Sequence, residues 1–547
     1  MDLIEACIRD VEINILDKYH ENQPLLQRSQ IEAISHILKV YGNILREFDL
    51  AESNQTRTGN RLTEEILLAL ALEQCLRWVL TSCKLISSSS QDSWQIIDEE
   101  AMSLISWARL YVKLCADYTA LSRGYYIATL NEALHEIRFD YKNIIEFTVY
   151  SSQMAAYPFH VNEVFNILPK KEIDDIFHQW KGKVNLTELH LPEKLPDFEN
   201  VFSVPNQLIM LEWSRATILP ELDDSENLHG FTLGDLRIFW ACLFLKCYLI
   251  ANLESYVDET IGSENDLGSV MLQGHSIEFS EYLGEYFKMD SITVLRIIDC
   301  LTFDESSHKS TLSNSPFIKT KCGAISILCR RVVKIDPYIM ISSSLAKRSR
   351  KSIYEALVHK IEKINVTNVG TQFQNIGFTV IIEGIFKSKE NVKICPDLIV
   401  YDQYNHQILI VDYKHAIPPI GAGEVGNRIR DLEKWKDQIR RYLTFFSKNE
   451  DIIKSKLKCT KISQVYGMLL FRWGMPIPVV TETDIVYADW STLSNILKVI
   501  EKPKISEINK FFRTPRDINQ IPRQWKIERE YIQVAQWTYI RPIIVSD

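Results

Sequence analysis

Several features of membrane and secreted proteins are missing from this 547-residue sequence. The first five residues lack the basic start and the apolar stretch of a secretory signal peptide. The most apolar run, residues 238–245, is interrupted by Lys246 and is far too short to span a bilayer. We therefore expect a cytoplasmic protein that has no membrane partner.

The sequence also lacks closely spaced cysteine pairs, although it contains eleven cysteines. Cys242 and Cys247 lie in an apolar stretch, and Cys322 and Cys329 have no histidine close by, which argues against a zinc or iron–sulfur site. We expect reduced, mostly buried thiols. Internal repeats and the G-x-x-x-x-G-K-[ST] phosphate-binding motif are likewise missing.

Length and composition predict a multidomain globular protein, because 547 residues with 46% hydrophobic and 24% charged residues exceed one typical core. Helical periodicity dominates the first part of the chain, as at Leu62, Ile66, Leu70, Leu76 and Leu80. A proline-marked stretch near residue 195 suggests a boundary, and short strands are expected near 317–333. We expect a helical domain, a second mostly helical domain, an α/β domain and a C-terminal extension, over residues 1–195, 196–345, 346–501 and 502–547.

The order of elements changes after residue 350. Short apolar, β-branched runs bounded by turn residues predict strands, and apolar residues at helical spacing predict helices. The resulting order is helix, three strands, helix, two strands and helix, over residues 352–364, 377–386, 394–401, 408–414, 427–446, 465–471, 479–487 and 493–500.

Two acidic residues and a lysine stand at the ends of neighbouring predicted strands. Asp397 follows Pro396 where one strand begins, and Asp412 and Lys414 end the next strand. Side chains alternate between the faces of a strand, so Asp412 and Lys414 point the same way. Charges in such a place are costly unless they are used, and a hard divalent cation is the obvious use.

Pro396-Asp397 followed by Asp412-Tyr413-Lys414 resembles the motif of the PD-(D/E)xK nuclease superfamily. Gln438 and Tyr442, one helical turn apart on the next predicted helix, match the Q-x-x-x-Y of its RecB-like members. The resemblance covers residues 351–500. It implies a restriction-endonuclease-like α/β domain with a central mixed sheet, which here follows a large all-α N-terminal region.

The resemblance and the chemistry of these groups predict the same catalytic roles. Asp397 and Asp412, with the backbone carbonyl of Tyr413, can hold Mg²⁺, which accepts few protein carboxylates and for which Mn²⁺ can substitute. Lys414 beside the metal can orient the attacking water and stabilise charge in the transition state.

Members of the superfamily often add an acidic residue from the helix before the first strand. Glu355 is the candidate by its order in the chain, although it falls almost opposite the apolar stripe of that helix. Glu362 has the same difficulty. Glu383 on the first strand competes with both.

Positive charge is concentrated in the same part of the chain. Residues 346–461 contain 21 Lys and Arg against 13 Asp and Glu, whereas the whole chain has a net charge of −9. A basic block in an acidic protein is the pattern of a polyanion-binding domain, although a solvated charged surface looks the same. The side chains expected at the substrate or its phosphates are Gln438, Tyr442, Arg428, Arg430, Lys434, Lys436, Arg440 and Arg441.

Two other motifs point to weaker alternatives. Residues 421–426 match G-x-G-x-x-G, but a dinucleotide site needs an acidic residue about 20 positions on, where Arg440 and Arg441 stand. We interpret this stretch as a flexible loop beside the active site. His415 points to the strand face opposite Lys414, so a core or surface role is expected for it.

The function that follows is a Mg²⁺-dependent deoxyribonuclease, such as an endonuclease of an antiviral defence or DNA-processing system. The helical region would bind a protein partner, recognise the target or restrain the nuclease. RNA as the substrate, exonuclease action and an oligomeric state stay open. So does a non-catalytic protein that uses a nuclease-like domain as a nucleic-acid-binding scaffold, although the intact set of Asp397, Asp412 and Lys414 argues against it.

Overall fold

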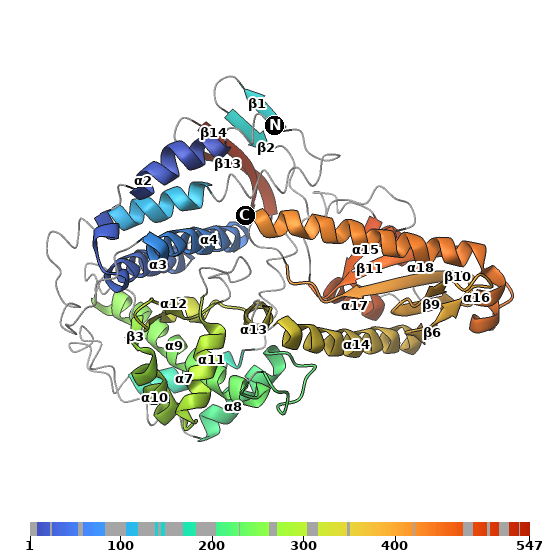
Figure 1. The fold of residues 1–547 in the computed structure, drawn as a ribbon, viewed down its shortest axis with the longest axis horizontal. Helices are drawn as coiled ribbons and strands as arrows, with labels where there is room; N and C mark the ends of the chain where they lie inside the picture. Colours follow the sequence, from blue (N-terminus) through green and yellow to red (C-terminus); the bar gives the residue numbers. More distant parts are fainter. Residues whose placement is uncertain are drawn as a thin grey trace.

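A computed structural model describes most of the chain and divides it into a mainly helical N-terminal region and a C-terminal region built on a mixed five-stranded sheet (Figure 1). The expected order, helices first and an α/β region afterwards, is confirmed. The described residues are 8–21, 24–52, 58–82, 106–118, 137–140, 144–147, 168–181, 204–228, 230–261, 271–303, 315–346, 351–418, 422–473, 485–499, 504–513, 525–534 and 537–546.

The first helices of the N-terminal region pack around one apolar core. Ile34, Ile37, Leu38, Tyr41 and Leu45 recur at helical spacing, so one face of their helix is buried. The elements are a π-helical turn, a 3₁₀ turn and four helices, over Glu12–Asp17 (η1), Pro24–Gln27 (η2), Lys18–Glu21 (α2), Gln30–Glu52 (α3), Thr58–Ser82 (α4) and residues 106–118.

A second core is built around the long helix α9. Its elements are the helices Lys170–Lys181 (α7), Val204–Thr217 (α8), Leu233–Ile261 (α9), Ser276–Phe287 (α10), Ser291–Leu301 (α11), Cys329–Val332 (α12) and Pro337–Leu345 (α13). The short strands expected near 317–333 are present. They are Ile318–Lys319 (β4) and Ala324–Leu328 (β5). With Met271–His275 (β3) they form an antiparallel sheet in the order β3-β5-β4.

Among the described helices, α9 alone is long and apolar enough to cross a membrane, judged by length and composition. However, 83% of its most apolar window is buried inside the protein, which is the environment of a core helix. Lys246 in this helix is fully buried and donates a hydrogen bond of 2.5 Å to the Tyr282 hydroxyl. Its ammonium also lies 4.3 Å from the centre of the Tyr286 ring, so the buried charge faces aromatic electrons.

The C-terminal region is a sheet between two layers of helices. Its strand order is β12-β11-β10-β9-β6, in which β10, β11 and β12 are parallel and β6 and β9 are antiparallel to their neighbours. The strands are Thr379–Ile382 (β6), Leu398–Asp402 (β9), Gln407–Lys414 (β10), Gln464–Phe471 (β11) and Ile485–Asp489 (β12). A separate hairpin is formed by Phe386–Lys387 (β7) and Lys393–Ile394 (β8).

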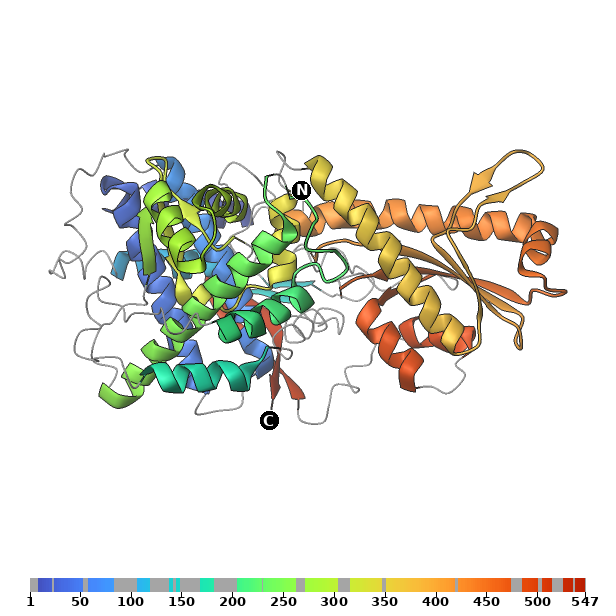
Figure 2. The same cartoon turned by 90° about the horizontal axis from the view of Figure 1, so that it is seen from below.

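The two faces of this sheet bury different cores. Helix α15 (Ala422–Lys448) covers one face, and α14 (Lys351–Asn375) crosses the other (Figures 1 and 2) together with α17 (Trp490–Val499) and α18 (Ile505–Arg513). Helix α16 (Glu450–Leu457) follows α15. At Gly370 in α14, an added Cβ would lie 3.0 Å from the Ile382 side chain, so this glycine lets the helix approach the sheet closely.

Three expected elements differ in the structure. Helix α14 continues eleven residues beyond 364, and the expected strand at 377–386 is divided into β6 and β7. The glycine-rich stretch is not a loop, because α15 begins at Ala422 and includes Gly423 and Gly426. Each helical glycine costs about 1 kcal/mol relative to alanine, and the long apolar face of α15 outweighs that cost. The expected strand at 479–487 lies partly outside the described residues.

The C-terminal residues join both regions of the protein. Ile505 and Ile508 of α18 are buried in the core beneath the large sheet, so this core continues beyond residue 501. The hairpin Trp525–Val534 (β13) and Trp537–Ser546 (β14) instead pairs with strands of the N-terminal region, Ile137–Asp140 (β1) and Ile144–Phe147 (β2). Strand β14 is parallel to β2, with Thr538 opposite Ile144.

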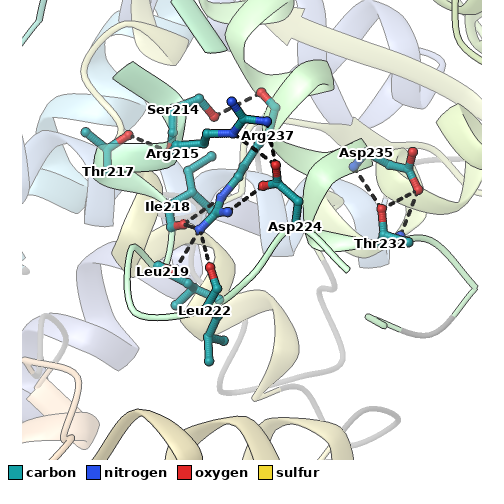
Figure 3. Close-up of polar contacts among 10 residues, drawn as sticks. All are labelled: Ser214, Arg215, Thr217, Ile218, Leu219, Leu222, Asp224, Thr232, Asp235 and Arg237. Atoms are coloured by element: carbon teal, nitrogen blue, oxygen red, sulfur yellow. Dashed lines mark hydrogen bonds and ion pairs between the residues drawn. The ribbon is translucent and has the colours of Figure 1, made fainter. Parts of the chain in front are cut away.

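One buried arginine organises the connection between α8 and α9, residues 218–232, which we call the α8–α9 loop (Figure 3). Arg237 is 3% exposed, and it donates to the carbonyl oxygens of Ile218, Leu219 and Leu222 at 2.8, 2.8 and 3.1 Å. It also pairs with Asp224 at 2.6 Å. One rigid guanidinium thus binds three carbonyls and a carboxylate of the loop at once.

We expect Arg237→Met to lower the free energy of unfolding of the helical region by about 2–4 kcal/mol, and the thermal midpoint with it. The substitution leaves the three carbonyls without their donor and leaves Asp224 with Arg215 alone. Arg215→Met is the matched control, since Arg215 also pairs with Asp224 at 2.6 Å but is half exposed, and should cost about 0–1 kcal/mol. Scanning calorimetry on both variants measures the difference. Equal midpoints would contradict the organising role of Arg237.

Candidate active site

The register of β9 and β10 brings the two aspartates together. Leu398 pairs with Val411 in this antiparallel ladder, so Asp397 and Asp412 occupy the next opposed positions. Ile399 and Ile410 are buried on the α15 face, and alternation places Asp397, Asp412 and Lys414 on that same face. The sequence-based expectation that Asp412 and Lys414 share a face is therefore met.

The three charged side chains are in close contact. The Lys414 ammonium lies 2.7 Å from Oδ2 of Asp412, whose side chain is 1% exposed. Within the described residues, Oδ2 of Asp412 makes this ion pair and accepts no hydrogen bond. Asp397 is held by the backbone, because its Oδ2 accepts a hydrogen bond of 2.8 Å from the Tyr413 amide.

Burial changes the ionisation of this pair of carboxylates. The pKa of Asp397 is raised to about 7, first by burial and then by the nearby charge of Asp412, while Lys414 opposes the shift. Two carboxylates at one buried corner cannot both ionise freely, so near neutral pH the pair shares a proton. A divalent cation would replace that proton with charge that suits both groups.

Gln438 and Tyr442 of α15 are hydrogen-bonded to each other, and they contact Asp412 and the backbone just before Pro396-Asp397. Gln438 Nε2 donates to Asp412 Oδ1 at 3.3 Å and to the Tyr442 hydroxyl at 2.7 Å. That hydroxyl donates to the Cys395 carbonyl at 3.3 Å, beside the Pro396-Asp397 turn. Burial raises the pKa of Tyr442 to about 12, which keeps its donor proton in place. The two residues thus tie α15 to both strands that carry the aspartates.

The acidic residue that α14 brings to the site is Glu362, and Glu355 lies away from it. Glu362 accepts a hydrogen bond of 3.0 Å from the His415 amide, and its carboxylate interacts electrostatically with Lys414 and Asp412. Burial raises the pKa of Glu362, against the pull of the His415 amide and of Lys414. Glu355 is exposed.

Helix geometry explains the difference between the two glutamates. Seven residues are almost two full turns, so Glu355 and Glu362 share a helix face but stand about 10 Å apart along the axis. The competing residue Glu383 has an exposed side chain, and only its amide reaches the site, by donating to the Asp397 carbonyl at 2.8 Å. Sequence order alone favoured the wrong turn of the helix.

The basic residues of α15 are mostly engaged with neighbours. Arg428 turns inward, where it donates to the Ile417 carbonyl at 2.9 Å and lies 5.5 Å from the centre of the Trp435 ring. Arg430 binds the Asn427 side chain. Lys434, Lys436 and Arg440 pair with acidic residues three positions earlier, and Arg441 is exposed. Such exposed pairs are weak, so a phosphate can displace them, whereas Arg428 supports the chain after β10.

His415 is buried on the opposite side of β10, as its strand position predicts. Its ring lies 5.7 Å from that of Tyr338 and 5.1 Å from that of Trp473. Burial lowers the pKa of His415 to about 3, with a smaller contribution from Arg472. The imidazole is therefore neutral at physiological pH and lies away from the carboxylates.

The donor set suits a small hard cation. Within the described ranges, no group of three or more His, Cys, Asp and Glu side chains converges as a ready-made metal site. Mg²⁺ needs fewer, because it keeps several waters and binds through one or two carboxylates. Asp397 and Asp412 provide these, and the buried Asp412 Oδ2 without a hydrogen bond is an available ligand atom. The proposed contribution of the Tyr413 carbonyl stays a prediction.

Comparisons with known proteins add no relative, since no protein-family model, curated protein or solved structure matches the chain.

We expect Asp397→Asn to stabilise the metal-free protein above pH 7. A carboxyl whose folded pKa is raised from 3.8 to about 7 contributes stability at low pH and loses it as pH rises through this range. The asparagine amide is uncharged at every pH, so the variant does not lose this stability. In EDTA its thermal midpoint should be higher than that of the wild type at pH 8 and equal to it at pH 4. Thermal scans test this, with the exposed Asp437→Asn as the control. An advantage that is independent of pH would contradict the assignment.

Proposed function

We propose that this protein is a metal-dependent nuclease whose centre consists of Asp397, Asp412 and Lys414. The observation that carries the proposal is the convergence of two carboxylates and an ammonium where the adjacent strands β9 and β10 begin and end, with the Lys414 ammonium 2.7 Å from a carboxylate that is 1% exposed. A buried arrangement of this kind costs stability. The resemblance to PD-(D/E)xK nucleases gives it a use, namely phosphodiester hydrolysis with a bound Mg²⁺ or Mn²⁺.

The residues divide the work by their chemistry. Asp397 and Asp412 would hold the metal, and a bound metal would supply positive charge for the scissile phosphate and lower the pKa of a water. Lys414 carries its ammonium 2.7 Å from Asp412, and there it would orient the water and stabilise negative charge in the transition state. Gln438 and Tyr442 keep Asp412 and the turn before Asp397 in fixed orientation.

The substrate we propose is DNA. The surplus of positive charge over residues 346–461 favours a polyanion, and the exposed basic residues of α15 lie on the helix that covers the site. RNA shares the phosphate backbone, so the assay must compare both. The same proposal includes a protein partner bound by the helical region.

We expect purified protein to cut DNA in Mg²⁺ or Mn²⁺ and not in EDTA. Asp397→Ala and Lys414→Ala should each lower the rate by about 10²–10⁴-fold, because each removes a group that acts at the reacting phosphate. Supercoiled plasmid, linear duplex, single strands and RNA serve as substrates. Lys389→Ala, an exposed lysine on the β7–β8 hairpin, controls for the loss of a positive charge.

The same assay separates the enzyme from a non-catalytic scaffold. Cutting that survives both substitutions, or that continues in EDTA, would rule out the proposed centre. Nucleic-acid binding without cutting under any condition would favour the scaffold. A filter-binding measurement therefore accompanies each reaction.

Gln438→Leu should weaken Mn²⁺ binding by about 10–100-fold, since residues that orient metal ligands typically contribute this much. The leucine keeps the apolar part of the side chain and loses the donor to Asp412. Titration calorimetry with Mn²⁺ measures the affinity. Gln403→Leu is the control. Gln403 lies on an exposed turn after β9 and donates a hydrogen bond to Thr379, so its loss removes an amide donor that does not contact either aspartate. An unchanged affinity would show that Asp412 needs no such support.

A further inference from the structure

A second polar cluster lies on the other side of β10, where the helical region meets the sheet. Its centre is Glu221 of the α8–α9 loop, whose side chain is 6% exposed. The Tyr338 hydroxyl of α13 donates to Glu221 at 3.2 Å, and the Asn365 amide of α14 donates at 3.4 Å. The guanidinium of Arg472, directly after β11, lies 3.1 Å from the same carboxylate.

The position of Glu221 is set by the helical region. It stands between Leu219 and Leu222, whose carbonyls are bound by the buried Arg237 (Figure 3). Further along the same loop, Glu226 pairs with Lys360 of α14. The loop that carries the Glu221 carboxylate is therefore held by Arg237 on one side and by the Glu226–Lys360 pair further along.

Arg472 connects this carboxylate to the candidate active site. Its amide donates to the Lys414 carbonyl at 3.3 Å, and the His415 amide of the same peptide group donates to Glu362, so the peptide bond that follows Lys414 is held at both its oxygen and its nitrogen. Burial disfavours the charge of Arg472, but Glu221 together with Tyr338, Tyr413 and Asp336 outweighs burial, and the pKa of Arg472 is raised. Glu221 thus holds the side chain of Arg472, and the amide of Arg472 holds the carbonyl of Lys414.

The apolar contacts around the cluster belong to the helical region as well. Trp473 is buried in the core that surrounds α9, and Ile417 and Ile361 pack with the same core. The Tyr338 ring meets Trp473 edge to face at a centroid distance of 5.1 Å. Ile417, after β10, and Trp473, after β11, thus pack against the core of the helical region.

We infer that Glu221 is a positioning residue for Lys414, through which the helical region controls the nuclease centre. This inference rests on the proposed function for its catalytic consequence, while the coupling itself is a property of the backbone and can be measured without any substrate. The helical region would then be part of the working enzyme, since the ammonium of Lys414 must stand within about 3 Å of its targets to act.

The test uses the full chain with Glu221→Gln, which keeps the shape and removes the charge. We expect amide exchange of Arg472 and His415 to become roughly tenfold faster, because an ionic hydrogen-bonded contact is lost. In the cleavage assay kcat should fall about tenfold with little change in KM, since Lys414 acts on the chemical step. Glu221→Asp keeps the carboxylate and should recover part of both values.

Two further variants keep the test decisive. Tyr338→Phe removes one donor to Glu221 without touching the sheet, and it serves if Glu221→Gln fails to fold. Glu212→Gln, an exposed glutamate on α8, is the matched control and should change neither exchange nor kcat.

The possible results separate the two proposals. Faster exchange confined to the α8–α9 loop, with residues 412–415 unchanged, would overturn the positioning role and leave Glu221 as a local structural residue. If the wild type cuts no nucleic acid, the proposed function fails, and the exchange of Arg472 and His415 still decides whether Glu221 controls the end of β10.

Discussion

Two carboxylates share one buried corner of the sheet, and a single ammonium balances them. Because β9 and β10 are antiparallel with Leu398 opposite Val411, Asp397 has no other place than beside Asp412. The surrounding contacts follow from this constraint. The Tyr413 amide holds one carboxylate and Gln438 holds the other, while burial first and the charge of Asp412 second raise the pKa of Asp397.

Much of this corner could be predicted from local sequence, because strands have a simple period. The alternation of β10 places Asp412 and Lys414 together, and one helical turn separates Gln438 from Tyr442. The choice between Glu355 and Glu362 could not be made in that way. Both occupy one face of α14, and only the packing of that helix against the sheet decides which turn reaches β10.

Other features depend on contacts between distant residues, for which a single sequence carries no local signal. Glu221 and Arg472 are unremarkable charged residues when read along the chain, and their pairing appears only when the α8–α9 loop meets the end of β11. The sequence predicts that the basic residues of α15 bind phosphates, and this stays a prediction. The structure adds that Arg428 supports the backbone after β10 and that several of the others are paired.

The pairing of β2 with β14 has a consequence for how the protein is made. Ile144 and Thr538 are roughly 400 positions apart, so a ribosome that has completed β2 must translate the whole sheet region before its partner strand emerges. Contacts between such distant segments close slowly and late in folding. The four-stranded sheet can therefore be completed only after β14 has been translated, when every strand of the large sheet has already been made.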